Sequence, residues 1–173
     1  KKEEAITGVS KTSLKRELSH DRDKRRLLDE AHPIFRALEM SDSSGRIKPT
    51  KRDKYIQIDQ LLRILEPTLE RFQEGSALQV VDLASGSAAL TLALHVYLNE
   101  RYFVSTTGVE QNPDLVAPAS ETVRAAKLSN INFLESTIQE SRIERSDVVL
   151  ALHACDLATD AAIDFVVKVK AKV

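Results

Sequence analysis

Apolar and polar residues alternate in two distinct patterns in the second half of the chain. Short apolar runs have the composition of buried strands at residues 78–83, 103–109, 131–134 and 147–152. Longer segments have apolar residues at helical spacing at residues 88–98, 113–128 and 156–169. Strands that alternate with helices predict an α/β fold with a parallel sheet and right-handed crossovers. Because the strand runs are apolar throughout, we expect helices on both faces of that sheet.

The first half of the chain has the pattern of helices. Residues 13–30 favour a helix, although their apolar positions are sparse, and residues 41–45 (S-D-S-S-G) form a clear loop. A second helix is predicted to begin at Thr50, with apolar residues on one face as far as Leu65. We expect Pro67 to interrupt this helix and to start a short further turn.

Composition and charge both change along the chain. The linker around Gly75 predicts a boundary between an N-terminal helical segment, residues 1–74, and an α/β domain, residues 75–173. Residues 1–66 carry 16 Lys and Arg against 12 Asp and Glu, a surplus of 4, whereas residues 67–173 carry 9 against 14. Such a basic segment can contact a polyanion such as RNA, and the alternative is an ordinary solvated helical surface. The basic residues in question are Arg22, Lys24, Arg25, Arg26, Lys48, Lys51, Arg52 and Lys54.

Composition excludes several classes of protein. An apolar fraction of 42% supports a real core, yet no apolar run approaches the length of a membrane span. The first residues, Lys-Lys-Glu-Glu, do not resemble a signal peptide, and the lack of an initial Met suggests a fragment or a processed form. Cys155 has no cysteine partner, so we expect neither an internal disulfide nor a cysteine metal site. We therefore expect a cytoplasmic protein that binds no metal and no membrane.

Polar residues stand where three of the predicted strands stop. In an open parallel sheet, ligands bind outside the carboxyl ends of the strands. Residues 82–88 follow the first strand, and the small residues around Gly86 allow a ligand to approach the backbone at the start of a helix. The alternative is an ordinary tight turn between strand and helix.

The other two strand ends carry titratable side chains. Glu110 ends the second strand, where a carboxylate can accept hydrogen bonds from the hydroxyls of a ribose; the alternative is a solvated loop carboxylate. His153 follows the fourth strand and is a candidate acid, base or orienting group, or else a histidine packed at the strand end. Asp156 is a second candidate there, or a helix cap.

Three stretches together resemble the class I S-adenosylmethionine-dependent methyltransferases: V-V-D-L-A-S-G-S-A-A-L, G-V-E-Q-N-P-D-L-V and V-V-L-A-L-H-A-C-D-L-A-T-D. More narrowly, the chain is similar to a methyltransferase-like family with the motif His-Ala-Cys-Asp-x-Ala-Thr-Asp, from about His20 onward. The resemblance implies a Rossmann-like sheet that binds S-adenosylmethionine. The cofactor-binding residues that it implies are Asp82, Ala84, Ser85, Gly86, Glu110, Gln111, Ser136 and Thr137, and the implied catalytic residues are His153 and Asp156.

The sequence departs from that family in two respects. The first loop of the family usually reads Asp-Leu-Gly-Cys-Gly-x-Gly, and here Ala84, Ser85 and Ala88 stand at the first Gly, the Cys and the last Gly. Alanine suits a negative φ at these positions, whereas a positive φ costs an alanine about 1 kcal/mol or more. The family sheet also continues beyond the fourth strand, so we expect a truncated sheet with an apolar edge left unpaired on that strand.

The leading hypothesis is an S-adenosylmethionine-dependent methyltransferase that acts on a nucleophilic N or O atom, with RNA as a candidate acceptor. One alternative is a non-catalytic binding or scaffold domain that retains the fold. Another is an NAD-dependent oxidoreductase, which the single glycine of the first loop disfavours, because a pyrophosphate needs a closer approach to the backbone.

Overall fold

The computed structural model describes residues 26–152 and 156–173, and its elements alternate as predicted after residue 76. In chain order they are α2 (Pro33–Ala37), the 3-10 helix η1 (Pro49–Lys51), α3 (Arg52–Leu69), β1 (Ala77–Leu83), α4 (Ala89–Asn99), β2 (Phe103–Glu110), α5 (Pro113–Ala125), β3 (Ile131–Glu135), β4 (Val148–Leu150) and α6 (Asp156–Val169). Every predicted strand is present, although β4 is shorter than its apolar run. Within these residues, no helix combines the length and the apolar character needed to cross a membrane.

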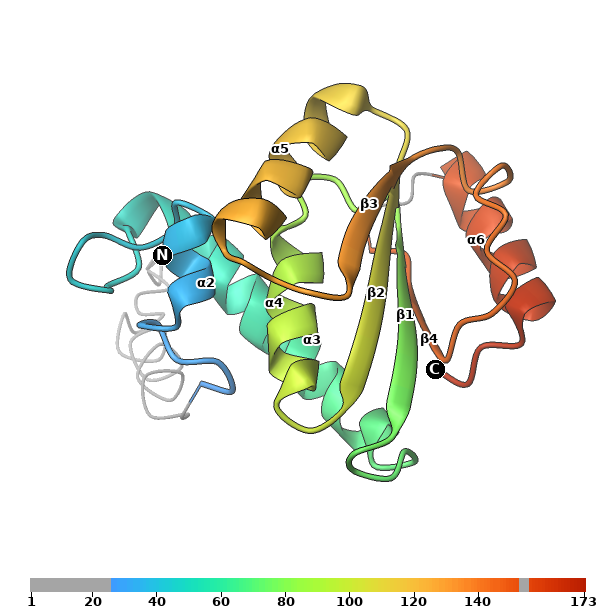
Figure 1. The fold of residues 1–173 in the computed structure, drawn as a ribbon, viewed down its shortest axis with the longest axis horizontal. Helices are drawn as coiled ribbons and strands as arrows, with labels where there is room; N and C mark the ends of the chain where they lie inside the picture. The colour runs from blue at the N-terminus through green and yellow to red at the C-terminus, as the bar shows by residue number, and fades with distance from the viewer. Residues whose placement is uncertain (1–25, 153–155) are drawn as a thin grey trace, which may run out of the picture.

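The four strands form one parallel sheet in the order β3-β2-β1-β4. Helices α4 and α5 lie on one side of the sheet and α6 lies on the other (Figure 1). The predicted α/β fold with a Rossmann-like parallel sheet is therefore confirmed. The chain proceeds from β1 outward to β2 and β3 and then returns to β4 on the opposite side of β1, so the strand order reverses beside β1. A ligand crevice is expected at that reversal, outside the carboxyl ends of the strands.

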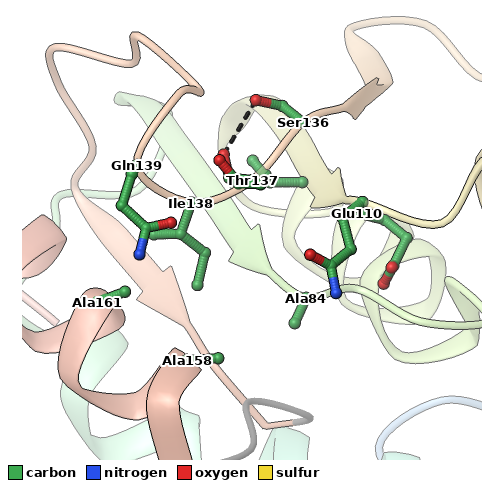
Figure 2. Close-up of a pocket in the computed structure, with 10 residues that line it drawn as sticks. Ala84, Glu110, Ser136, Thr137, Ile138, Gln139, Ala158 and Ala161 are labelled. Atoms are coloured by element: carbon green, nitrogen blue, oxygen red, sulfur yellow. Dashed lines mark hydrogen bonds between the residues drawn. The ribbon is translucent and has the colours of Figure 1, made fainter.

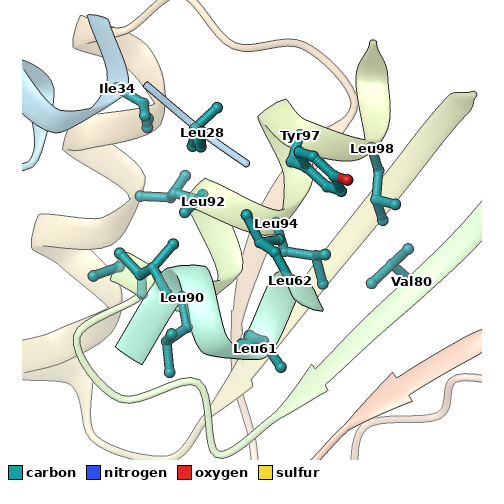
Figure 3. Close-up of a cluster of buried hydrophobic side chains, with 14 of the residues drawn as sticks. Leu28, Ile34, Leu61, Leu62, Val80, Leu90, Leu92, Leu94, Tyr97 and Leu98 are labelled. Atoms are coloured by element: carbon teal, nitrogen blue, oxygen red, sulfur yellow. The ribbon is translucent and has the colours of Figure 1, made fainter. Parts of the chain in front are cut away.

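The larger core lies between the sheet and the helices on the α4 side. Figure 3 shows Leu61 and Leu62 of α3 beside Leu90 and Leu94 of α4, with Val80 of β1 in the same cluster. Because α4 packs against both α3 and β2, it is apolar nearly all round, as its sequence predicts.

The N-terminal part of the chain contributes to the same core. Leu28, Ile34 and Phe35 are buried in one cluster with residues of β1 and α4. The ring of Phe35 lies edge-on to Tyr55 of α3, with 5.1 Å between the ring centroids. The helical segment and the α/β part thus share apolar packing, and the division into residues 1–74 and 75–173 stays a prediction.

A smaller core holds α6 on the opposite face of the sheet. It consists mainly of Val81, Leu83 and Val109 from the strands and of Ala162 and Phe165 from α6. This packing places the start of α6 at the carboxyl end of the sheet (Figure 1).

The structure corrects the prediction that Pro67 interrupts the second helix. Helix α3 continues through Pro67 and ends at Leu69. Leu62 and Leu69 are both fully buried on α3, and their packing stabilises the last turn despite the missing proline N–H.

Residues 26–30 are not helical, contrary to the prediction, while residues 13–25 lie outside the described part of the chain. The Leu27 N–H donates to Asp59 Oδ1 at 2.9 Å, and the Tyr55 hydroxyl donates to the Leu28 carbonyl at 2.8 Å. These contacts with α3 replace hydrogen bonds that a local helix would make, so tertiary structure overrides helix propensity here.

The expectation of an unpaired edge on β4 is also wrong where the last residue of the chain meets it. The Val173 N–H donates to the Asp147 carbonyl at 3.1 Å, and the Val173 carbonyl accepts from the Val149 N–H at 2.8 Å. This is the hydrogen-bond pattern of a parallel pair between Val173 and Val148. Lys172 adds an ion pair with Asp147 at 3.2 Å.

Candidate functional site

The loop after β1 passes three times through backbone conformations with positive φ. The φ angles are 55° at Ala84, 55° at Gly86 and 59° at Ala88, the residue that precedes α4. Glycine adopts this region at no steric cost, whereas an alanine side chain crowds the following carbonyl and costs about 1–2 kcal/mol. The two alanines that replace family glycines therefore occupy positions where glycine is the unstrained residue.

Glu110, at the end of β2, joins this loop to the loop after β2. Its Oε2 accepts a hydrogen bond from the Gly86 N–H at 2.9 Å, and its Oε1 accepts one from the Asn112 N–H at 3.0 Å. The Glu110 side chain is largely buried, with 9% of the residue exposed. Each carboxylate oxygen keeps a further lone pair for a ligand.

Asp82, near the end of β1, is buried and bonded within the fold. Its Oδ2 accepts a hydrogen bond from the Thr91 hydroxyl of α4 at 2.5 Å. Burial raises the pKa of Asp82 to about 6; the Thr91 hydrogen bond opposes this rise, Glu110 adds to it, and Lys54 opposes it. The structure thus gives Asp82 a role in holding α4 against β1.

A close contact between β2 and β3 lies beneath the first loop. A Cβ atom added at Gly108 would lie 2.3 Å from the Phe133 ring and 3.1 Å from Ser85 Oγ. Ser85 is 3% exposed, and its hydroxyl has no hydrogen-bond partner within the described residues. Ser85 stands at the position where the family that the sequence resembles carries cysteine. It is a small buried side chain beside Gly108 of β2.

A cavity of about 290 Å³ opens at the carboxyl end of the sheet, between the loops after the strands and α6 (Figure 2). Its walls are mostly apolar, with one carboxylate and several hydroxyl and amide groups. In Figure 2 the side chains of Ile138 and Gln139 point from the loop after β3 toward Ala158 and Ala161 of α6. The lining residues are Ala84, Val109, Glu110, Gln111, Ser136, Thr137, Ile138, Gln139, Ala158 and Ala161.

The cavity brings together five of the residues that the sequence singles out as cofactor-binding: Ala84, Glu110, Gln111, Ser136 and Thr137. Ser136 and Thr137 follow β3, and the Ser136 hydroxyl donates to the Thr137 carbonyl at 2.9 Å. The structure thereby gathers residues from three successive strand ends into one site.

The other predicted site residues do not line this cavity. Asp82 at the end of β1 and Ser85 in the first loop are buried, and the Gly86 N–H is directed at Glu110. His153 lies outside the described residues, and Asp156 is described only as the first residue of α6. Their catalytic role stays a prediction.

Sequence analysis missed Gln139, Ala158 and Ala161. The two alanines are three positions apart on α6 and therefore lie on one face of the helix. Two small side chains on one face leave space beside a helix, but this pattern is too common to indicate a site. Gln139 follows β3 in a segment without regular structure, where no pattern of apolar residues marks a role.

The side chains that line this cavity fit an adenine nucleoside. Ile138 and Ala161, on opposite sides of the cavity, can pack against the two faces of a purine. The Glu110 carboxylate, already oriented by two backbone N–H groups, can accept hydrogen bonds from ribose hydroxyls. S-Adenosylmethionine is a cofactor whose nucleoside part these residues would hold.

Among residues 26–66, several basic side chains are engaged in contacts within the fold. Arg26 pairs with Asp59 at 3.0 Å, and Arg52 pairs with Glu30 at 2.5 Å. Lys48 Nζ donates to a backbone carbonyl at 2.8 Å. Arg22, Lys24 and Arg25 lie outside the described residues.

Residues 53–173 match the model of a protein family described as a methyltransferase domain. No curated protein sequence matches the chain. An SAH-bound methyltransferase from Podospora anserina superimposes with a TM-score of 0.62 at 9% identity, over 96% of this chain and 68% of its own. A putative RNA methyltransferase from Pyrococcus horikoshii gives a TM-score of 0.52 at 15% identity, over 66% of this chain and 56% of its own.

These structural similarities establish the fold alone, since the sequence identities are low. The chain also spans less than two thirds of several of the proteins it matches, for example 45% of a Bacillus protein that it matches at a TM-score of 0.48 and 19% identity.

Proposed function

The chain belongs to the methyltransferase domain family, and from this membership we propose that it transfers a methyl group from S-adenosylmethionine to a nucleophilic N or O atom of an acceptor. The single observation that supports this proposal most is the Glu110 carboxylate, held by two backbone N–H groups at the edge of a mostly apolar cavity. The narrower assignment to the family with the His-Ala-Cys-Asp-x-Ala-Thr-Asp motif is a proposal that rests on the sequence resemblance.

Glu110 is proposed to bind the ribose. Its two oxygens are fixed by Gly86 and Asn112, so the carboxylate needs no reorganisation to accept two hydroxyl hydrogen bonds. Preorganised acceptors lower the entropy cost of binding. Loss of such a buried partner typically costs about 1–3 kcal/mol.

The residues that follow β3 are proposed to bind the adenine. Ser136 and Thr137 supply polar groups at the cavity edge, and Ile138 and Ala161 supply apolar surface on opposite sides of it. A flat ring fits between such walls, and hydrogen bonds at its edge select it from other rings.

S-Adenosylmethionine, when bound, supplies an electrophilic methyl group on a sulfonium sulfur. The contribution of the protein is then to place the acceptor atom in line with that methyl group and to exclude water. His153 and Asp156, which follow β4, are proposed to accept or relay the proton that the acceptor loses.

RNA is proposed as the acceptor class, on the strength of the surplus of 4 basic residues in residues 1–66. Of the basic residues that the structure describes, Lys51 is exposed beside the start of α3, where a phosphate can reach it. Affinity for RNA should fall steeply as salt rises, because each phosphate contact releases counterions. Methylation that does not depend on salt would instead indicate a protein or a small-molecule acceptor.

Calorimetric titration with S-adenosylmethionine, S-adenosylhomocysteine and NAD tests the cofactor assignment. We expect the first two ligands to bind and to compete with each other, and NAD not to compete. Absence of binding at about 1 mM ligand, which corresponds to less than about 4 kcal/mol of binding free energy, would overturn the assignment. Binding without methylation of any cellular RNA or protein would indicate a scaffold role.

A further inference from the structure

The sheet face that carries α6 is covered along only part of its length. Val81, Leu83 and Val109 are buried against this helix near the carboxyl ends of the strands. Nearer the amino ends, the side chains on the same face are exposed or half-buried, and they alternate along each strand with buried residues on the α4 side. These side chains, which we call the open face, belong to Ala77, Gln79, Phe103, Ser105, Thr107 and Asn132.

The polar side chains of the open face are neighbours across the strands. Gln79 of β1 pairs in register with Ser105 of β2, and Thr107 of β2 pairs with Asn132 of β3. The Thr107 hydroxyl donates to Asn132 Oδ1 at 3.3 Å. The other hydroxyl and amide groups of this row can donate hydrogen bonds to a ligand or accept them.

Phe103 begins this row on β2. It is 75% exposed and stands two residues before Ser105 on the same face, a separation of about 7 Å along a strand. A single exposed apolar side chain needs no explanation by itself. An aromatic ring beside a row of polar groups on an uncovered sheet, however, can stack on the flat face of a nucleic acid base.

Two arginines from the segment after β3 lie beside the open face. Arg142 and Arg145 line a hollow of about 430 Å³ together with Gln79, Ser105 and Thr107. Both arginines are exposed, and neither guanidinium forms a hydrogen bond or an ion pair with any residue in 26–152 or 156–173. A guanidinium group binds phosphate through two parallel N–H groups.

The charges and groups of this surface fit a single strand of RNA. Glu144 is the acidic residue in the lining of the hollow, so two positive charges stand against one negative charge there. The ring can stack on a base, the guanidinium groups can bind phosphates, and the hydroxyl and amide groups can bind base edges and 2′-hydroxyls. A double helix fits less well, because its bases are already stacked and paired.

The segment after β3 also lines the cavity beside Glu110. Gln139 belongs to the wall of that cavity, and Arg142 follows Gln139 by three residues. Three residues of chain span at most about 11 Å. RNA that is bound by Arg142 therefore lies near the cavity in which the methyl donor is proposed to bind.

We propose that the open face, with Phe103, Arg142 and Arg145, binds single-stranded RNA. This inference rests on RNA as the proposed acceptor class and adds a surface that binds it, on the opposite side of the sheet from α4 and α5 (Figure 1).

The test measures binding of a labelled, unstructured oligoribonucleotide of about 12 nucleotides by fluorescence anisotropy at several salt concentrations. The variants are Phe103→Leu, Phe103→Tyr and a double variant with Arg142→Gln and Arg145→Gln. Arg124→Gln is the control for loss of charge, because Arg124 is exposed on α5. Urea denaturation checks that the variants fold like wild type, as expected for exposed side chains.

Phe103→Leu should weaken binding by about tenfold without a change in salt dependence, because stacking releases no counterions, and Phe103→Tyr should bind like wild type. The arginine double variant should bind more weakly and should reduce the slope of log affinity against log salt by about 1.4, which is about 0.7 for each phosphate contact. Arg124→Gln should leave both affinity and slope unchanged. Annealing the RNA to its complement should abolish the difference between wild type and Phe103→Leu, since paired bases cannot stack on the ring.

If the Phe103 and arginine variants all bind RNA like wild type, the RNA is bound elsewhere and the proposal is wrong. A loss in the arginine variant with no loss in Phe103→Leu would also contradict it, because the surface would then bind phosphate groups and not bases. If wild type binds no RNA, both this proposal and RNA as the acceptor class fail, whereas calorimetry with S-adenosylmethionine tests the cofactor assignment separately.

Discussion

Glu110 Oε2 lies 2.9 Å from the Gly86 nitrogen and accepts its N–H, so the end of β2 is bonded directly to the loop after β1. Replacement of Glu110 by Gln removes one of the two carboxylate acceptors and leaves one of the backbone N–H groups without a partner. We expect unfolding free energy to fall by about 1–3 kcal/mol and affinity for S-adenosylmethionine to fall by about 10–100-fold. Chemical denaturation and calorimetry measure the two effects.

Glu135→Gln is the matched control for this change. Glu135 ends β3, pairs in register with Glu110 and is exposed. The control should leave both quantities within the error of wild type, because surface substitutions usually cost less than about 0.5 kcal/mol. Equal losses in the two variants would show that the charge at this edge of the sheet, and not the loop contact, controls binding.

Glycine should relieve strain at Ala84. This residue is half-buried with a φ of 55°, so Ala84→Gly is expected to raise unfolding free energy by about 1 kcal/mol. Ala88 also has a positive φ, of 59°, but its methyl group is fully buried in the core. Ala88→Gly should therefore be nearly neutral, because loss of about 0.8 kcal/mol of burial offsets the relief.

Thermal or urea unfolding of the two variants tests this difference. A loss of stability in Ala84→Gly would mean that the loop adopts a negative φ in solution. In that case alanine would be an unstrained residue at the position where the family has glycine.

The strand ends of the site could be predicted because they depend on a strong local signal. An apolar run that stops at Asp82 or Glu110 marks the carboxyl end of a strand, and parallel strands bring such ends together. The resemblance to a family then indicated Ser136 and Thr137, which line the same cavity. The chemistry of these residues stays a prediction.

The features that sequence analysis missed depend on contacts between distant segments. The positive φ of Ala84 and Ala88 could not be predicted, because alanine, unlike Gly86, does not mark that conformation. Ala161 could not be assigned to the site, since a helical pattern does not determine which face of α6 meets the loop after β3. Residues 26–30 were expected to be helical from their local propensity. The hydrogen bonds to α3 that hold them in another conformation are long-range, so the local sequence does not indicate them.

A methyl group at Gly108 should disrupt the packing between β2 and β3. The added Cβ would approach the Phe133 ring to 2.3 Å, so Gly108→Ala is expected to reduce unfolding free energy by about 1–3 kcal/mol. In the background of Phe133→Leu, which removes the ring, the same change should cost less. A double-mutant cycle by urea denaturation measures this coupling, and additive losses would argue against the contact.

A larger side chain at Ala161 should block the cavity without unfolding the protein. Ala161 lies on the cavity wall opposite Ile138, so Ala161→Leu is expected to abolish measurable binding of S-adenosylmethionine. The control Asp164→Leu places the same side chain at an exposed position of α6. Binding by Ala161→Leu at wild-type affinity would show that the cofactor lies elsewhere.

Asp82 should make stability depend on pH in the opposite direction from an ordinary ion-paired carboxylate. Burial raises the pKa of Asp82 from 3.8 to about 6, so the folded state holds a proton that the unfolded state releases. The stabilising contribution is fully present below the unfolded pKa and is lost as pH rises through about 6. A shift of about two units corresponds to about 3 kcal/mol.

Asp82→Asn cannot titrate at this position, so the difference in unfolding free energy between wild type and variant isolates Asp82. We expect this difference to change by up to about 3 kcal/mol in favour of the variant between about pH 4 and about pH 7. Thr91→Val, which removes a hydrogen bond that lowers the pKa of Asp82, should move the transition to higher pH. Urea denaturation at a series of pH values measures both, and a difference that is constant with pH would show that Asp82 is already ionised throughout this range.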